Sequence, residues 1–206
     1  MAANPPRIFL ASTSPRRREL LRQIGVHFDV LTFRSGERGD DADVDETPFA
    51  NEDVAHYVER IALTKAEAGV RRTVWRRLPR RPILAADTTL ELDGEIIGKP
   101  ADAADARAIL ARLSGRTHRV LTGVAVSDGE HTRSLISVSE VRFRALRDQE
   151  IRHYVASGEP MDKAGAYGIQ GRAAIFIEEI RGSYSGIMGL PLFETAQLLE
   201  GFGYPL

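Results

Sequence analysis

The sequence contains no cysteine among its 206 residues. This absence excludes a disulfide framework, a thiolate zinc site, an iron–sulfur cluster and a cysteine nucleophile, and it fits a reducing cytoplasm. Long hydrophobic runs are also missing: the apolar segment near the N-terminus covers only residues 8–11. It is shorter than the core of a signal peptide, and no window approaches the roughly 18 apolar residues of a membrane-spanning helix. We therefore expect a cytoplasmic protein with no membrane association.

The chain has almost no excess of either charge, with 28 basic and 29 acidic side chains and a formal net charge of −1. A protein that coats nucleic acid would carry a basic excess, so we expect no nucleic-acid partner. A hydrophobic share of 43% excludes wholesale disorder. The length suits one domain over residues 1–206, or two tightly joined lobes.

Expected strands and helices alternate along the chain. Asp-Gly pairs at 93–94 and 128–129 signal hairpins, and since hairpins force antiparallel pairing, the sequence predicts an α/β protein with a mixed sheet. The expected strands are residues 7–11, 26–31, 82–92, 95–98, 118–127, 130–143 and 173–180. The expected helices are residues 15–24, 52–69, 103–113, 146–156 and 191–199, with a surface loop or frayed helix end over 71–82.

A helix start near the N-terminus breaks a local electrostatic rule. Ser14 followed by Pro15 is typical of a first helical turn, yet three arginines follow at 16–18. Cations there oppose the helix dipole at a cost of about 0.3–1 kcal/mol each. A bound phosphate would reverse that penalty, because it would meet free backbone N–H groups, hydroxyls and guanidinium groups together. The alternative is a solvated basic turn.

Carboxylates at the ends of apolar strands form a second signal. Asp87 directly follows the apolar run 83–86, where a carboxylate is costly to bury unless it is paired or bound to metal. The hairpin at 93–94 brings Lys99 near the same end of the ribbon. A carboxylate for Mg²⁺ beside a lysine for phosphate is a recurring pairing, and Glu46 is a candidate second carboxylate. The alternative is a surface ion pair.

A third signal is the glycine-rich segment 162–171. Gln170 offers a donor and an acceptor that suit the edge of a nucleobase, and Lys163 adds a cation. Taken by themselves, these residues favour an ordinary flexible connection over a site.

With these clusters in hand, the chain resembles the Maf family of nucleotide pyrophosphatases (Maf/Ham1-like). The matching segments run in the family order and span nearly the whole chain: LASTSPRRRELL (10–21), VDE (44–46), the Lys65-Ala66 pair, AADTTLELDGEIIGKP (85–100), LSGRTHRVLTGVAV (113–126), GEPMDKAGAYGIQG (158–171) and IRGSYSGIMGLPL (180–192). One such segment alone would be weak evidence, but seven in register are highly specific.

The resemblance implies a two-lobed, ITPase-like α/β fold with a cleft. It also implies hydrolysis of nucleoside triphosphates between the α and β phosphates with a divalent metal, Mg²⁺ or Mn²⁺. The family is associated with removing nontypical or excess nucleotides and with arrest of septum formation, and a homodimer is left open.

The family motifs assign roles to nine positions of this chain. The residues implied to hold the triphosphate are Ser12, Arg16 and Arg17. The two implied to serve the metal and the attacking water are Glu46 and Asp87. The cations implied to balance phosphate charge are Lys65 and Lys99, and Lys99 joins the two carboxylates in the catalytic set. The pair implied to help select the base is Thr88 and Gln170.

Three positions separate the subgroups of the family. Arg16, Thr88 and Gln170 all match the group that resembles dTTP/UTP pyrophosphatases. A Nudix hydrolase is excluded, because Arg22 and Gln23 stand where its metal-binding glutamates must be. The remaining alternative is a nucleotide-binding regulator of cell division without significant turnover. The intact set of Asp87, Glu46 and Lys99 favours the enzyme.

Overall fold

One mixed sheet organises the chain in a computed structural model, which describes residues 5–32 and 44–206. Within those residues the sheet has seven strands. They are β1 (Ile8–Leu10), β2 (Phe28–Val30), β3 (Ile83–Leu92), β4 (Glu95–Ile97), β5 (Thr117–Ser127), β6 (Thr132–Phe143) and β7 (Ile177–Arg181). The acidic segment before Val44 lies largely outside the described residues.

The strand order is β2-β1-β3-β5-β6-β7, with β4 paired to β3 beside this path. Strand β1 runs parallel to β2 and β3, whereas all the other pairs are antiparallel. The predicted mixed sheet is thus confirmed. At the first hairpin Asp93 and Gly94 both have positive φ, 57° and 80°, as the tight turn that matches strand twist requires.

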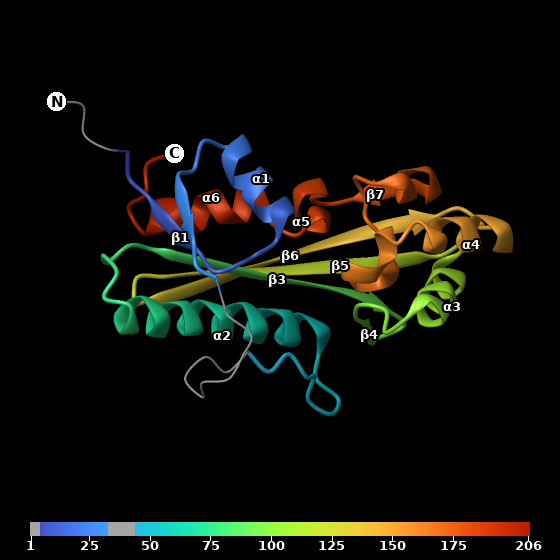
Figure 1. Ribbon diagram of the computed structural model, residues 1–206, viewed down its shortest axis with the longest axis horizontal. Coiled ribbons are helices and arrows are strands. Elements are labelled where there is room, and N and C mark those ends of the chain that lie inside the picture. The colour runs from blue at the N-terminus through green and yellow to red at the C-terminus, as the bar shows by residue number, and fades with distance from the viewer. Residues whose placement is uncertain (1–4, 33–43) are drawn as a thin grey trace.

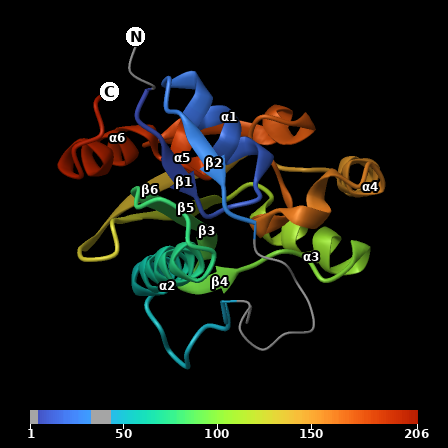
Figure 2. The ribbon, with the colours of Figure 1, turned by 60° about the vertical axis from the view of Figure 1, so that its left-hand side comes forward.

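Helices cover both faces of the sheet (Figure 1). They are α1 (Pro15–Gln23), α2 (Val54–Trp75), α3 (Ala103–Leu113), α4 (Asp148–Ala156), α5 (Tyr184–Met188) and α6 (Leu192–Gly201). Helix α2 lies on one face, and α1, α5 and α6 lie on the other, an arrangement that the turned view repeats (Figure 2). No helix in the described part of the chain is long and apolar enough to cross a membrane.

The structure refines two sequence expectations. Residues 71–82 were expected as a surface loop or a frayed helix end, and because helix α2 continues to Trp75, residues 71–75 are the helix end. Residues 172–176 form a 3-10 helix, η3 (Arg172–Phe176), and the last strand begins only at Ile177. The reason is visible in burial: Ala173 and Phe176 are buried while Ile175 is 71% exposed, which is a helical spacing of apolar contacts and not an alternating one.

Strand β3 packs its alternating side chains against different helices. Ile83 and Ala85 belong to the apolar cluster that contains Ala62 and Ala66 of α2. Leu84 and Ala86 point to the other face of the sheet and belong to the apolar cluster that contains residues of α1 and α6. A third cluster joins the far end of the sheet to α3 and α4, so the core lies in two lobes along the long strands.

Helix α2 approaches the sheet closely at Gly123 of β5. A Cβ atom at this position would lie 2.7 Å from the Val58 carbonyl oxygen and 3.3 Å from Glu59 Cα. Both atoms are backbone of α2, so a side chain could be fitted only by moving the helix.

We therefore expect Gly123→Ala to destabilise the fold by about 1–3 kcal/mol, the usual cost of overpacking a tight core contact. Urea unfolding measures this loss. Gly98→Ala is the matched control, because a Cβ there meets nothing within 4 Å, and its stability should stay within about 0.5 kcal/mol of the parent. Equal stability of the two variants would contradict the close approach.

Candidate active site

A cavity of about 860 Å³ opens between the two lobes. Its walls come from the loop between β1 and α1, from α2, from the middle of β3, and from segments near residues 162–170 and 187–189. A volume of this size suits a ligand as large as a nucleotide.

The side chains of β3 also point alternately to the two faces of the sheet where the strand lines this cavity. Asp87 has the parity of Ile83 and Ala85, so it faces α2, where its Oδ1 accepts a hydrogen bond of 2.7 Å from Lys65 Nζ. The same ammonium lies 2.6 Å from Glu46 Oε1. Asp87 is only 7% exposed, so its charge is compensated within the protein.

Lys65 thus joins the two predicted carboxylates. Without its positive charge, Glu46 and Asp87 would face each other as two uncompensated negative charges. Tyr57, also on α2, donates a hydrogen bond of 2.9 Å to the Glu46 backbone carbonyl and holds that residue at the cavity. Burial, together with the negative charges of Asp87 and Glu46, raises the pKa of Tyr57 to about 12, so its hydroxyl stays protonated.

The carboxylate pair fits a divalent cation that the ligand helps to coordinate. Among residues 5–32 and 44–206, no group of three or more His, Cys, Asp or Glu could hold a metal ion by itself. Mg²⁺ commonly binds through one or two carboxylates and completes its shell with phosphate oxygens and waters. Glu46 and Asp87, which here share the Lys65 ammonium, could supply that minimal donor set.

The opposite wall is the start of α1, which follows the predicted pattern. Ser14 caps the helix, accepting a hydrogen bond from the Arg17 backbone N–H, and Pro15 is its first residue. The Arg17 guanidinium turns back over this start and donates to the Gly189 carbonyl at 2.8 Å and to Ser12 Oγ at 3.2 Å. Burial lowers the pKa of Arg17, an effect that the charge of Asp87 opposes.

Thr88 and Thr122 support Arg17 from the sheet. Arg17 Nη2 donates to Thr88 Oγ1 at 3.4 Å. The Thr122 hydroxyl lies 2.9 Å from that of Thr88 and 2.8 Å from the Gly186 carbonyl. The Thr122 hydroxyl is the donor toward both of these acceptors. Thr88 Oγ1 thus accepts from both Thr122 and Arg17, and this side chain holds Arg17 in place.

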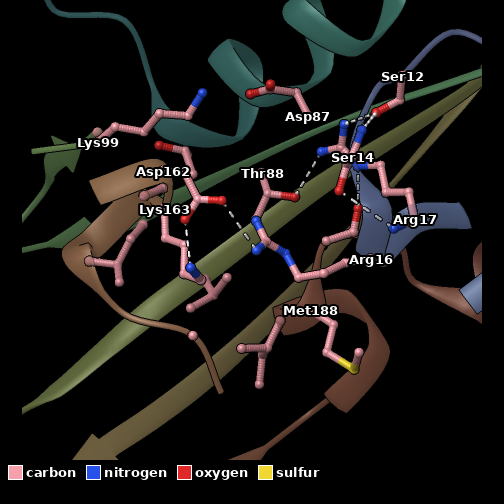
Figure 3. A pocket seen from close by; sticks show the side chains of 18 of the residues that line it. Ser12, Ser14, Arg16, Arg17, Asp87, Thr88, Lys99, Asp162, Lys163 and Met188 are labelled. Carbon is pink, nitrogen blue, oxygen red and sulfur yellow. Dashed lines mark hydrogen bonds and ion pairs between the residues drawn. The ribbon is translucent and has the colours of Figure 1, made fainter. Parts of the chain in front are cut away.

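Arg16 crosses the cavity toward the other lobe. Its Nη1 lies 3.7 Å from Asp162 Oδ2, and Lys163 Nζ lies 2.5 Å from the other oxygen of that carboxylate. Figure 3 shows Arg16 extending toward Asp162 while Arg17 extends toward Thr88. Since the Asp162 side chain is 69% exposed, the ion pair with Arg16 contributes little stability, and a bound anion can compete for the guanidinium.

The glycine-rich segment is ordered rather than a flexible connection. It forms η1 (Glu159–Asp162) and η2 (Ala164–Ala166) before η3. The Gly165 N–H donates to the Gly98 carbonyl at 3.0 Å and ties the segment to the end of the first hairpin. Gln170 and Lys99, both exposed, line the cavity from this side.

All nine residues singled out from the sequence line this one cavity: Ser12, Arg16, Arg17, Glu46, Lys65, Asp87, Thr88, Lys99 and Gln170. The sequence reasoning gave no functional part to Thr122, Tyr57 and Gly189. A signal for Thr122 exists, since it is a lone hydroxyl inside an apolar strand and pairs with Thr88 in the β3–β5 register. Gly189 acts through its carbonyl, and no residue pattern marks a backbone acceptor.

The chain is thus a mixed α/β protein with a polar, charge-paired cavity between two lobes. The chain belongs to the Maf-like protein family, whose model matches residues 7–202. A dTTP/UTP pyrophosphatase of Aromatoleum aromaticum is 78% identical over 200 residues, covering 97% of each chain. Another, from Dechloromonas aromatica, is 60% identical over 198 residues, covering 96% of this chain and 98% of that protein.

The fold has a distant counterpart among solved structures. The Ham1 protein of Staphylococcus aureus matches with a TM-score of 0.51 and 17% identity, covering 95% of this chain and 97% of the other. At that identity the likeness concerns the fold, and the predicted Maf/Ham1-like architecture is confirmed.

The threonine network yields a stability prediction. Thr122→Val keeps the shape but leaves the Gly186 carbonyl and the Thr88 hydroxyl without their partner, so we expect a loss of about 1–3 kcal/mol in urea unfolding. The matched control is Thr195→Val. Thr195 is also fully buried, but its Oγ1 has no hydrogen-bond partner in the described part of the chain, so its replacement should be neutral or stabilising. Equal losses in both variants would contradict the network.

Proposed function

We propose that this protein hydrolyses dTTP and UTP to the monophosphate and pyrophosphate. The observation that carries the proposal is the meeting of cations and carboxylates in one cavity, in a chain 78% identical to a dTTP/UTP pyrophosphatase. Arg16, Arg17 and Lys99 supply the charge that a triphosphate needs, and Glu46 and Asp87 supply the groups for hydrolysis. A non-catalytic regulator would not need this pair of carboxylates, one of them buried, and is not favoured.

The phosphates would bind over the start of α1. Ser12 and the backbone N–H groups of the first turn offer neutral donors, and the helix dipole favours an anion there. Arg17 is already oriented by Thr88 and Gly189, so little rotational freedom is lost when a phosphate binds. Arg16 would exchange Asp162 for the phosphate, and Lys99 would approach from the hairpin.

Hydrolysis requires water to attack the α-phosphorus while the bond from that phosphorus to the bridging oxygen breaks. Asp87 would take the proton of the water, and Lys65 Nζ lies 2.7 Å from its Oδ1 and 2.6 Å from Glu46 Oε1. A divalent cation, Mg²⁺ or Mn²⁺, would be held by Glu46 and Asp87 and would supply further neutralisation of phosphate charge. The pyrophosphate leaves with its negative charge shared by Arg16, Arg17 and Lys99.

Gln170 is the proposed reader of the base. Uracil and thymine present adjacent carbonyl and N–H groups, which a glutamine amide matches with its own NH₂ and C=O. Gln170 lies at the cavity edge on the lobe that faces Arg16 and Arg17, so the base and the phosphates would rest on opposite walls.

The test of this function is a panel of purified nucleoside triphosphates incubated with the full-length protein, with and without Mg²⁺. We expect pyrophosphate and monophosphate from dTTP and UTP. Release of only orthophosphate, or binding without turnover, would overturn the proposal.

We expect Asp87→Asn to lower kcat by about 10²–10⁴, the range for loss of a proton-transferring group. The amide keeps the shape of the side chain but can neither accept the proton nor pair fully with Lys65. Asp29→Asn is the control. Asp29 lies on β2, outside the cavity, and pairs with Arg7 and Arg81, so turnover should persist. Near-normal activity of a folded Asp87→Asn would move the chemistry elsewhere, with Glu46 the first suspect.

Gln170→Glu replaces the NH₂ donor with an acceptor that faces a base carbonyl. In the parent protein we expect CTP and GTP to be poorer than UTP by roughly tenfold or more, because one mismatched buried hydrogen bond costs about 1–3 kcal/mol. The variant should lose that preference, measured as ratios of kcat/KM. If all nucleotides slow by the same factor, Gln170 does not read the base.

A further inference from the structure

The turn that carries Gln170 is fastened at both ends by side chains. At its start the Gly168 N–H donates to the Tyr154 hydroxyl at 3.3 Å. At its end the Arg172 N–H donates to both oxygens of the Glu159 carboxylate, at 3.1 and 3.2 Å. The Tyr154 hydroxyl in turn donates to Glu159 Oε1 at 3.0 Å. Within the turn, the Gly171 N–H donates to the Gly168 carbonyl at 3.0 Å.

The packing around this turn leaves no room for a side chain at two of its glycines. A Cβ atom at Gly171 would overlap the Glu159 carboxylate, and one at Gly168 would lie 2.9 Å from Lys163 Cε. Lys163 Nζ donates to the Glu159 carbonyl at 2.6 Å, which fixes the residue that holds the turn. The glycines therefore serve close approach of two side chains and not flexibility.

The Tyr154 hydroxyl links the two fastenings of the turn, because it accepts from the Gly168 N–H and donates to Glu159. Tyr154 is only 4% exposed, and its ring packs edge-on against Phe176 at a centroid distance of 5.3 Å. Burial raises the pKa of Tyr154, so the hydroxyl keeps its proton, donates to Glu159 and accepts from Gly168. Of the residues that the structure describes, those lining the cavity include Gly168 and Gln170 but neither Tyr154 nor Glu159.

We propose that Tyr154 and Glu159 are positioning residues for base selection, because together they hold the Gln170 turn at the distance and angle at which its amide meets a pyrimidine. They would act through Gln170 and touch no substrate atom. This inference rests on the proposed function, in which Gln170 reads the base.

The decisive variant is Tyr154→Phe, which removes one oxygen atom and keeps the ring. The matched control is Tyr204→Phe: Tyr204 is 6% exposed, and its hydroxyl accepts a backbone N–H bond of 2.9 Å from His27, away from the cavity. For each protein, kcat and KM are measured by pyrophosphate release from UTP, dTTP, CTP and GTP with Mg²⁺, and the midpoint of thermal unfolding is recorded.

In Tyr154→Phe we expect the UTP-to-CTP ratio of kcat/KM to fall about three- to tenfold, the equivalent of one hydrogen bond. The loss should come from a higher KM for UTP, with kcat within about twofold of the parent, since the reacting groups are untouched. Tyr204→Phe should lower the unfolding midpoint to a similar extent and leave the ratio unchanged. A merely structural role of Tyr154 predicts the same result for both variants.

A second pair of variants tests the other end of the turn. Glu159→Gln keeps one oxygen for the Arg172 N–H and an amide group that Tyr154 can accept from, whereas Glu159→Ala keeps neither. We expect the alanine variant to lose selectivity and the glutamine variant to retain most of it. This pair also decides the matter if Tyr154→Phe fails to fold.

The outcomes separate the two proposals. No pyrophosphate from the parent protein would overturn the proposed function itself. A parent that is active and selective, with unchanged ratios in folded Tyr154→Phe and Glu159→Ala, would overturn this inference and leave the function standing. A loss of selectivity in Tyr154→Phe that Tyr204→Phe does not share would support it.

Discussion

The alternation of strand β3 is the constraint on which the rest of the site depends. Successive side chains of a strand point to opposite faces, so Asp87 reaches Lys65 of α2 while Thr88 reaches Arg17 of α1. One strand thereby presents an acidic group to one helix and a hydroxyl to the other. A shift of register by a single residue would exchange the two faces and dismantle both partnerships at once.

Each partnership is completed by groups from distant parts of the chain. Lys65 forms ion pairs with both Glu46 and Asp87, its ammonium lying 2.6 and 2.7 Å from the two carboxylates. Arg17 donates a hydrogen bond to the carbonyl of Gly189, and Thr122 of the neighbouring strand donates one to Thr88. The site is thus organised before any ligand arrives, which reduces the reorganisation that catalysis would otherwise require.

Local patterns predicted the elements that local forces govern. The Ser14-Pro15 helix start and the Asp93-Gly94 hairpin are set by capping and turn geometry over a few residues, and both were found as expected. The short helix α5 is not predicted by the sequence pattern, and residues 173–176, expected as the start of a strand, belong to the 3-10 helix η3 instead. In the latter segment the burial of Ala173 and Phe176 decides the conformation, and burial depends on what packs above the segment.

The sequence by itself determined the family, the mixed sheet and the nine cavity residues, because these follow from motif identity, hairpin turns and residue chemistry. Only the tertiary structure decided which side chains form hydrogen bonds and ion pairs with one another. It placed Lys65 between two carboxylates rather than alone, joined the Thr88 hydroxyl to that of Thr122, and fastened the Gln170 turn through Tyr154 and Glu159. Hydrogen bonds and ion pairs act over about 3–4 Å, and contacts at that range between residues far apart in the chain exist only after the fold has brought them together.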